Sequence, residues 1–322
     1  MWQEIARTIS QTTGQEFAIA NTRSVSGGCI NRGYQVFGNK TNYFVKINDA
    51  SQVEMFAAEA LGLQQMYATQ TITVPQPICW GTAGNSSYIV LEWLDLAGGN
   101  EQSWTEMGRQ LAAMHRQGTS DRVLNGANAP ALRSSFEPIG SVSLMGETPK
   151  TALHRFGWDR NNTIGSTPQV NTWMDNWADF FAQQRIGYQL KLANRRGGNL
   201  GNADRVVNAV RDRLADRKPT ASLLHGDLWS GNAAIAADGS PVILDPATYY
   251  GDRETDLAMT ELFGGFKSAF YRGYNEAWQL DSGYQQRKSI YNLYHVLNHF
   301  NLFGGGYANQ AQRIIAQIIA VS

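Results

Sequence analysis

Leu224-His225-Gly226-Asp227-Leu228-Trp229-Ser230-Gly231-Asn232 is the stretch that decides the fold. It places an Asp five residues before an Asn and a His two residues before that Asp, which is the spacing of a catalytic loop for phosphoryl transfer. In such a loop the Asp accepts the proton of the attacking hydroxyl, and the Asn ligates Mg²⁺ beside the phosphates. The spacing predicts Asp227 as the catalytic base and Asn232 as a metal ligand. The alternative is a helix-capping Asp before an ordinary hairpin.

A short hairpin is expected directly after this stretch. Apolar residues alternate over 233–236, Asp238-Gly239 has the composition of a turn, and residues 241–244 read as a second strand that ends at Asp245. A hairpin of this length returns Asp245 close to Asn232. Two oxygen ligands then face one site, which suits a hard cation such as Mg²⁺.

Length and composition limit the class of protein. The chain has 322 residues, 43% of them hydrophobic, which is enough for one large domain or two lobes. Lys+Arg and Asp+Glu both number 27, so the formal net charge is zero and the basic excess typical of nucleic-acid binders is missing. We find no run of about 18 apolar residues and no signal peptide, and two cysteines are too few for a disulfide scaffold. These features predict a cytoplasmic protein that binds neither nucleic acid nor membranes.

The first part of the chain reads as strands that cover a nucleotide. Gly27 and Gly28 lie in a turn between two strands, where glycines let backbone amides approach phosphates. Taken alone, the two glycines favour a plain hairpin turn, and the strand that follows strengthens the phosphate-binding interpretation. Lys46 is the single cation of the apolar strand 43–47, the context of a phosphate-binding lysine. A solvent-facing lysine on an alternating strand is the alternative.

A helix after this strand offers two carboxylates as partners for Lys46. Ser51 and Glu54 fit a capping box at its start, which accounts for Glu54. Glu59 lies beside the apolar stripe of the helix, one turn before Leu63, so we expect it to point inward and to pair with Lys46.

We expect a boundary between two lobes near residue 95. Pro75 begins a rigid turn, two strands follow, and Gly98-Gly99 marks a change of composition. The prediction is an α+β, bilobal protein-kinase-like fold, with a small β-rich N-lobe at 1–95 and a larger, mostly helical C-lobe at 96–322. Adenine would bind through the backbone of the connection, so the nucleotide residues would include Glu92, Trp93 and Leu94. Glu92 could equally be a solvated boundary charge.

The C-lobe is expected to be helical, with one polar segment of interest. We predict helices over 172–194 and 203–216 and a surface excursion over 117–150. His115 ends a core helix, where hydrogen bonding to backbone is a simpler interpretation than catalysis. We expect Asp256 to anchor the catalytic loop through its backbone amides. The segment 154–165 is dense in polar and aromatic groups, which suits either a polyhydroxylated substrate or a loop packed by its own side chains.

Taken together, these residues resemble one family. The run from His225 to Asn232, with Trp229 inside it, resembles the signature of the fructosamine kinases, or ketosamine-3-kinases, of the aminoglycoside and choline kinase branch of the protein-kinase-like superfamily. The likeness continues through Gly-Gly-Cys-Ile-Asn at 27–31, the segment 158–165, Asp245-Pro246-Ala247 and residues 291–303, and so covers nearly the whole chain.

The resemblance implies a reaction and a set of roles. Asp227 would be the base acting on the sugar 3-hydroxyl, Asn232 and Asp245 the Mg²⁺ ligands, and Lys46 with Glu59 the anchor of the ATP phosphates. The acceptor would be a ketosamine, either a small molecule or a glycated protein side chain. Its labile 3-phosphate would release the amine, which implies deglycation and protein repair. The residues that we expect to contact the sugar are Trp229, Trp158, Asn161 and Asn162.

The resemblance also points to Cys29 as a redox-sensitive cysteine that could link two chains, so we expect either a monomer or a Cys29-linked homodimer. A small residue in a tight turn is the alternative for this position. Two functions compete with ketosamine phosphorylation: a kinase of the same fold acting on an aminoglycoside, choline or homoserine-like alcohol, and a catalytically inactive binding module. A protein kinase is disfavoured because no Ala-Pro-Glu segment follows Asp245 at the expected place.

Overall fold

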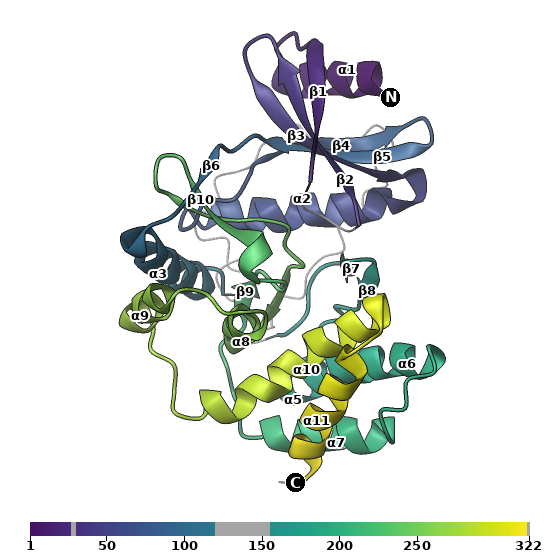
Figure 1. The fold of residues 1–322 in the computed structure, drawn as a ribbon, viewed down its shortest axis with the longest axis vertical. Helices are drawn as coiled ribbons and strands as arrows, with labels where there is room; N and C mark the ends of the chain where they lie inside the picture. Colours follow the sequence, from purple (N-terminus) through teal and green to yellow (C-terminus); the bar gives the residue numbers. More distant parts are fainter. Residues whose placement is uncertain (27–29, 120–154, 321–322) are drawn as a thin grey trace.

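The N-terminal part of the molecule is built on a five-stranded antiparallel sheet (Figure 1). A computed structural model describes residues 1–26, 30–119 and 155–320. The strand order is β1-β2-β3-β5-β4. The strands are β1 (Ile19–Val25), β2 (Arg32–Gly38), β3 (Asn42–Asp49), β4 (Pro77–Ala83) and β5 (Ser86–Glu92).

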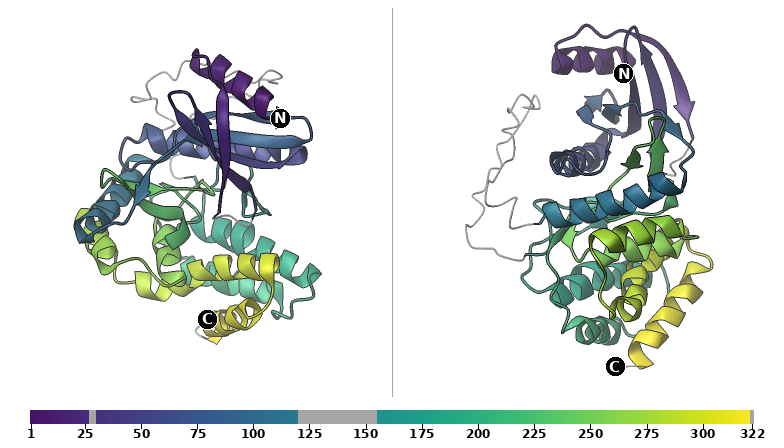
Figure 2. Two further views of the ribbon diagram at one scale, coloured as in Figure 1. Left: turned by 45° about the horizontal axis from the view of Figure 1, so that its top comes forward. Right: turned by 90° about the vertical axis from the view of Figure 1, so that its left-hand side faces the viewer.

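One helix covers each face of this sheet. Successive side chains of a strand point to opposite faces, and both faces carry apolar side chains that a helix buries. Helix α1 (Trp2–Thr13) packs Ile5 and Ile9 against residues such as Val45 and Val90. Helix α2 (Val53–Ala68) packs on the opposite face, where Ile89 and Leu91 join the main core of the molecule. In the right-hand view of Figure 2, α1 lies above the strands β4 and β5 and α2 lies below them.

Small sheets connect the two lobes and carry the catalytic loop. After β5 the chain forms β6 (Leu96–Ala97), which pairs with β10 (Ala233–Ala236), and β10 pairs in turn with β11 (Pro241–Ile243). Strand β9 (Ser222–Leu224) pairs with β12 (Tyr249–Gly251). The hairpin predicted after the catalytic loop is therefore present, and it is formed by β10 and β11.

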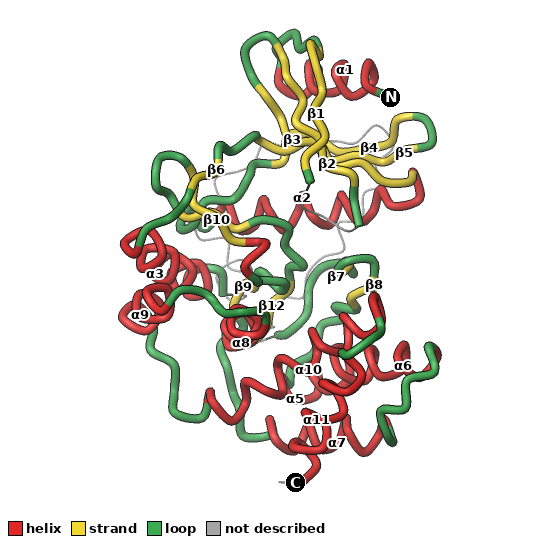
Figure 3. Tube along the Cα trace, viewed as in Figure 1, coloured by secondary structure: helices red, strands yellow, loops and turns green. Residues whose placement is uncertain are grey.

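The C-terminal part is mostly helical, as Figure 3 shows in red. Its helices are α3 (Glu101–Gln117), α5 (Trp177–Phe180), α6 (Tyr188–Arg195), α7 (Ala203–Leu214), α8 (Glu254–Leu262), α9 (Ser268–Ala277), α10 (Tyr284–Phe303) and α11 (Tyr307–Ala320). A second hairpin, of β7 (Asn162–Ile164) and β8 (Thr167–Gln169), packs against α2 and α10. The α+β architecture predicted from the sequence is confirmed.

Two local predictions were wrong. The helix expected over 172–194 begins only at Trp177, where the Asn176 side chain caps it, and it passes through a π-helical turn, η2 (Phe181–Gly187). The capping box at Ser51 is not formed, because residues 50–52 fold into a 3₁₀ turn (η1, Ala50–Gln52) and no side chain caps α2. Glu54 instead pairs with Arg160 of the C-lobe.

The predicted surface excursion at 117–150 lies mostly outside the described residues. None of the helices in the described ranges is both long and apolar enough to cross a membrane.

Candidate active site

The catalytic loop begins where β9 ends, and His225 fixes its first turn. The Nε2 atom of His225 lies 2.7 Å from the carbonyl oxygen of Leu244, and its Nδ1 accepts a hydrogen bond from the amide of Asp227 at 3.2 Å. A carbonyl can only accept, so Nε2 carries the ring proton. Burial lowers the pKa of His225, in keeping with this neutral form. His225 thus joins the loop to the strand that leads to Asp245.

Asp256, on helix α8, binds the backbone of the same turn. Its carboxylate accepts hydrogen bonds from the amides of His225 at 2.7 Å and Gly226 at 2.8 Å, which confirms the predicted anchoring role. Burial alone would raise the pKa of Asp256, but the hydrogen bond and charge of His115 and these amide bonds hold it below its ordinary value.

His115 takes part in this network through side chains, so the expected hydrogen bond to backbone was wrong. Its Nε2 lies 3.0 Å from Asp256 Oδ2, and its Nδ1 lies 2.9 Å from the hydroxyl of Tyr274. Tyr274 also accepts a hydrogen bond from Arg253 at 3.2 Å. A buried chain of contacts therefore runs from α9 through α3 to the catalytic loop.

Asp227 and Asn232 face one another across this loop. The Asn232 amide Nδ2 donates to the Asp227 carbonyl oxygen at 2.9 Å and lies 3.4 Å from its carboxylate. Burial, and then the charges of Asp245 and Asp256, raise the pKa of Asp227 to about 7. Because neighbouring carboxylates oppose each other's ionisation here, the loop is a place where a cation is stabilising.

Lys46 joins the sheet, α2 and the segment after β11. Its ammonium donates to Glu59 Oε1 at 2.7 Å, so the predicted Lys46–Glu59 ion pair is present, and it also contacts the carboxylate of Asp245. Burial alone would lower the pKa of Lys46, but these two carboxylates raise it above its ordinary value. Asp245 has a φ of 55°, a left-handed conformation that an Asp tolerates better than most residues.

The donor atoms at this point suit a hard divalent cation. Because the Asn232 Nδ2 is turned to Asp227, its Oδ1 is the atom left to coordinate a metal. The Asp245 side chain is 49% exposed, so it can turn to a second partner. In the described ranges no cluster of three or more His, Cys, Asp or Glu could hold a metal. Two oxygen ligands completed by phosphate and water is the coordination that Mg²⁺ commonly adopts.

The predicted nucleotide-binding connection lies at the end of β5. Glu92 is exposed, its amide donates to Gln76 at 2.8 Å, and the Trp93 indole donates to Asp95 at 2.8 Å. Phe44 lies on the same side of β3 as Lys46 and packs near Trp93, with ring centroids 6.5 Å apart. A surface hollow of about 440 Å³ borders Glu92 and Trp93, but none of the phosphate-side residues lines it.

The predicted sugar-contacting residues separate into exposed and buried ones. Trp229 is 38% exposed on the catalytic loop and can meet a ligand. Trp158 is 2% exposed, and its indole donates to Gln65 at 2.8 Å, so its ring faces protein and cannot form a wall of the sugar site in this conformation. Asn162 is likewise buried, with its Nδ2 on the carbonyl of Thr248. The Asn161 side chain accepts from the Asn171 amide.

Both buried side chains therefore serve packing and hydrogen bonding, contrary to the expectation that they contact substrate. The aromatic and amide composition of the segment had suggested a binding surface, but composition alone does not tell which way a side chain points. Gly27, Gly28 and Cys29 lie outside the described residues, so their predicted roles stay predictions.

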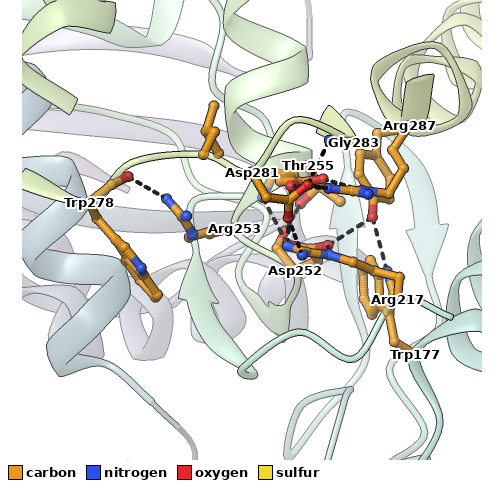
Figure 4. A network of polar contacts seen from close by, with 12 residues as sticks. Trp177, Arg217, Asp252, Arg253, Thr255, Trp278, Asp281, Gly283 and Arg287 are labelled. Carbon is orange, nitrogen blue, oxygen red and sulfur yellow. Dashed lines mark hydrogen bonds and ion pairs between the residues drawn. The ribbon is translucent and has the colours of Figure 1, made fainter. Parts of the chain in front are cut away.

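Sequence reasoning missed a second polar network beneath the site (Figure 4). Arg217 donates to Asp252 at 2.7 and 3.0 Å, and Arg287 donates through two nitrogens to Glu254, each at 2.7 Å. Both carboxylates are fully buried, and Tyr291 of α10 also donates to Asp252. The signal in the sequence was the charge-dense run 252–256, in a part of the chain otherwise rich in apolar residues.

The chain is similar to known proteins over nearly its whole length. The family model described as "Fructosamine kinase" matches residues 1–125 and 144–321. A probable ketoamine kinase of Synechocystis sp. is 55% identical over 320 residues, which cover 99% of this chain and 97% of that protein. The chloroplastic protein-ribulosamine 3-kinase of Arabidopsis thaliana is 38% identical over 310 residues, covering 94% of this chain and 84% of that one.

Solved structures show the same architecture. A candidate fructosamine-3-kinase from Haemophilus somnus superposes with a TM-score of 0.83 at 31% identity, over 99% of this chain and 98% of that one. A choline kinase from Streptococcus pneumoniae superposes with a TM-score of 0.58 at 14% identity, over 99% of each chain, which is a likeness of fold alone.

Proposed function

The chain belongs to the fructosamine kinase family, and on this premise we propose that it transfers the γ-phosphoryl group of ATP to the 3-hydroxyl of the sugar in a ketosamine. The observation that carries the proposal is the convergence of Lys46, Asp227, Asn232 and Asp245 at one point between the lobes. Phosphoryl transfer needs positioning and neutralised charge more than covalent chemistry, and these side chains provide both.

We assign a distinct task to each of these residues. Asp227 accepts the proton of the sugar hydroxyl as that oxygen attacks phosphorus, and the hydrogen bond from Asn232 Nδ2 keeps the loop carbonyl of Asp227 in place. Lys46, held by Glu59, contacts the phosphates of ATP. Asn232 and Asp245 would hold Mg²⁺, which when bound neutralises phosphate charge.

The proposed acceptor rests on the named relatives and on one exposed side chain of the catalytic loop. The named relatives act on ketoamines or on protein-bound ribulosamines. Trp229 is exposed two residues after the base, where an indole can stack on the apolar face of a sugar ring. We propose ketosamine adducts, free or on protein side chains, as acceptors, and release of the amine after phosphorylation as the physiological outcome.

Two finer proposals accompany this function. We propose that the protein acts in the cytoplasm; the relative from Arabidopsis thaliana is named as chloroplastic. We also propose that it works as a monomer or as a homodimer linked through Cys29. Electrophoresis with and without reductant, before and after mild oxidation, tests the linked dimer, and the variant Cys29→Ser should not form it.

The test of the function is ATP consumption in Mg²⁺ with a panel of acceptors: ribulosyl-lysine, fructosyl-lysine, choline and an aminoglycoside. We expect turnover with a ketosamine and a fall of about 10²-fold or more in kcat for Asp227→Asn, because the base is removed while the loop keeps its shape. Turnover with choline or the aminoglycoside alone would overturn the acceptor. Failure to turn over any acceptor or to bind ATP would leave a kinase-like binding module.

A further inference from the structure

The segment 156–171 lies between the two structural elements that carry the carboxylate partners of Lys46. One partner, Glu59, is on α2, and the other, Asp245, begins the stretch 245–250 that leads into β12. In kinases both the lysine–glutamate pair and the metal-binding Asp must be in place for catalysis, and an ordered activation segment controls this. The sequence shows no such segment after Asp245, so another part of the chain must supply the support.

Segment 156–171 is bound firmly to the stretch that follows Asp245. Gly157 and Tyr250 exchange both backbone hydrogen bonds, at 3.0 and 2.8 Å. The side chain of Asn162 donates to the carbonyl of Thr248 at 2.8 Å, and that of Gln169 donates to the carbonyl of Ala247 at 2.9 Å. Asn162 and Gln169 are both at least nine-tenths buried, so these amide bonds are shielded from water.

The same segment contacts α2 at both ends of the helix. The indole of Trp158 donates to Gln65 at 2.8 Å, near the C-terminal end, and Arg160 pairs with Glu54 at 2.5 Å in the first turn. Glu59 lies between these two contacts in the sequence. Helix α2 also lies directly on the 245–250 stretch, because a Cβ at Gly62 would come within 2.4 Å of the Thr248 hydroxyl.

The segment has its own support in the C-lobe. Arg185, fully buried in the π-helical turn η2, donates to the Val170 carbonyl at 2.6 Å and to the Asn171 side chain at 2.7 Å. Tyr294 of α10 donates to Gln169 at 2.6 Å. Hydrogen bonds therefore connect the helical core, through segment 156–171, to α2 and to the 245–250 stretch, the two elements that carry the carboxylate partners of Lys46.

We propose that segment 156–171 acts as a fixed strut that sets α2 and the Asp245 stretch relative to each other, with Trp158, Arg160 and Gln169 as positioning residues for Lys46. This role rests on the proposed function of Lys46 as phosphate anchor. In this proposal, segment 156–171, which precedes the catalytic loop in the chain, takes over the supporting role that an activation segment has in other kinases. It also accounts for the burial of Trp158 and Asn162.

The Arg160–Glu54 pair gives the sharpest test, because Glu54 is exposed and Arg160 is partly exposed, so reversing their charges is compatible with folding. We expect Glu54→Arg and Arg160→Glu each to weaken MgATP binding by about threefold or more, since like charges push the start of α2 away from the strut. Adenosine binding should stay unchanged, because Lys46 meets only phosphates. The double variant restores an attractive pair and should recover MgATP affinity.

Calorimetric titration of the full chain with MgATP and with adenosine measures these affinities without an acceptor. Failure of the ketosamine proposal would therefore leave this test intact. The control is Arg109–Glu276, another solvent-accessible pair, 2.7 Å apart, that joins α3 to α9. Arg109→Glu and Glu276→Arg should leave both affinities unchanged. Equal loss of MgATP and adenosine binding, or no recovery in the double variant, would overturn the positioning role of this pair.

A second variant tests the buried end of the strut. Trp158→Phe keeps an aromatic ring in the core but removes the indole N–H that Gln65 accepts. We expect a raised KM for ATP with an unchanged KM for the sugar amine. A raised KM for the sugar amine alone would instead assign Trp158 to the acceptor site, and wild-type constants for both substrates would remove Trp158 from the strut.

Discussion

At the scale of single residues, the loop between Asp227 and Asn232 shows why each position has the side chain it has. The Trp229 ring packs over Gly231, where an added Cβ would fall 2.4 Å from the indole carbons. Gly231 therefore lets the indole lie flat along the loop and leaves 38% of the Trp229 residue exposed. The exposed part of the indole lies two residues after the base, where it can serve as a stacking surface for the acceptor.

Trp229→Ala should raise the KM for the sugar amine by about tenfold at most, because one ring-stacking contact is worth about 0.5–1.5 kcal/mol. The KM for ATP should stay the same, since Lys46 and the lobe connection are untouched. Steady-state kinetics with each substrate varied in turn measures both constants, and Trp229→Phe is the control that keeps an aromatic face. An unchanged KM for the sugar amine would remove the stacking role.

Cys79 is a buried thiol, so we expect it to be less reactive than an accessible one. It is 3% exposed among the side chains under α1, and burial raises the pKa of its thiol to about 12. Because the thiolate is the reactive form, we expect the native Cys29→Ser protein to resist alkylation by iodoacetamide and to react fully once unfolded. Mass spectrometry of the alkylated protein checks this. Rapid labelling of Cys79 in the native variant would show that α1 opens readily.

At the scale of secondary structure, the helices α3 and α9 cross unusually closely. An added Cβ at Gly108 would lie 2.0 Å from the carbonyl oxygen of Phe270, and one at Gly273 would lie 1.9 Å from that of Thr105. These neighbours are backbone atoms, so they cannot rotate away. The close crossing places His115 and Tyr274 within hydrogen-bond distance, and it thereby supports Asp256 beneath the catalytic loop.

Gly273→Ala should lower the free energy of unfolding by about 1–3 kcal/mol, because the helices must separate to admit a methyl group. Denaturation by urea measures the change. Gly98→Ala is the matched control: a Cβ there meets no atom within 4 Å, so its effect should be small. A Gly273→Ala protein as stable as the wild type would mean that the two helices adjust without cost.

At the scale of the whole molecule, sequence reasoning succeeded where spacing along the chain determines geometry. The separation of Asp227 from Asn232, the hairpin to Asp245 and the helical face of Glu59 each follow from local periodicity. The partners of His115 lie 141 and 159 residues away, and those of Trp158 and Asn162 are 93 and 86 residues away. Such contacts depend on how distant elements pack, which no local pattern encodes.

The π-helical turn at 181–187 is a further example of this limit. Arg185 lies there over the rings of Tyr249 and Phe180, 4.0 and 4.6 Å from their centroids. Its guanidinium is held by carbonyl and amide oxygens from Val170 and Asn171. An arginine in an amphipathic pattern is expected to face solvent, and only the packing of α10 and β12 around this turn places it inside.

The free energy of unfolding of the whole molecule should fall in mild acid. We expect the buried His295 on α10 to contribute to this fall. His295 is 4% exposed, and its pKa is lowered to about 3, chiefly by burial and also by the charges of His299 and Arg185, while Asp256 opposes them. In the unfolded chain a histidine has a pKa of about 6.5. Between these two values the unfolded state binds a proton that the native state does not.

Folding must therefore become less favourable as the pH falls from about 6.5, by up to about 1.4 kcal/mol per pH unit from this one group. His295→Gln removes the titration, so the wild type should lose about 2 kcal/mol more than the variant between about pH 7 and about pH 5. Urea unfolding of both proteins at the two pH values measures this difference, and the carboxylates common to both cancel in the comparison. If the two proteins lost the same stability, protonation of His295 would be accommodated in the native core, which would require water or a carboxylate to reach its ring.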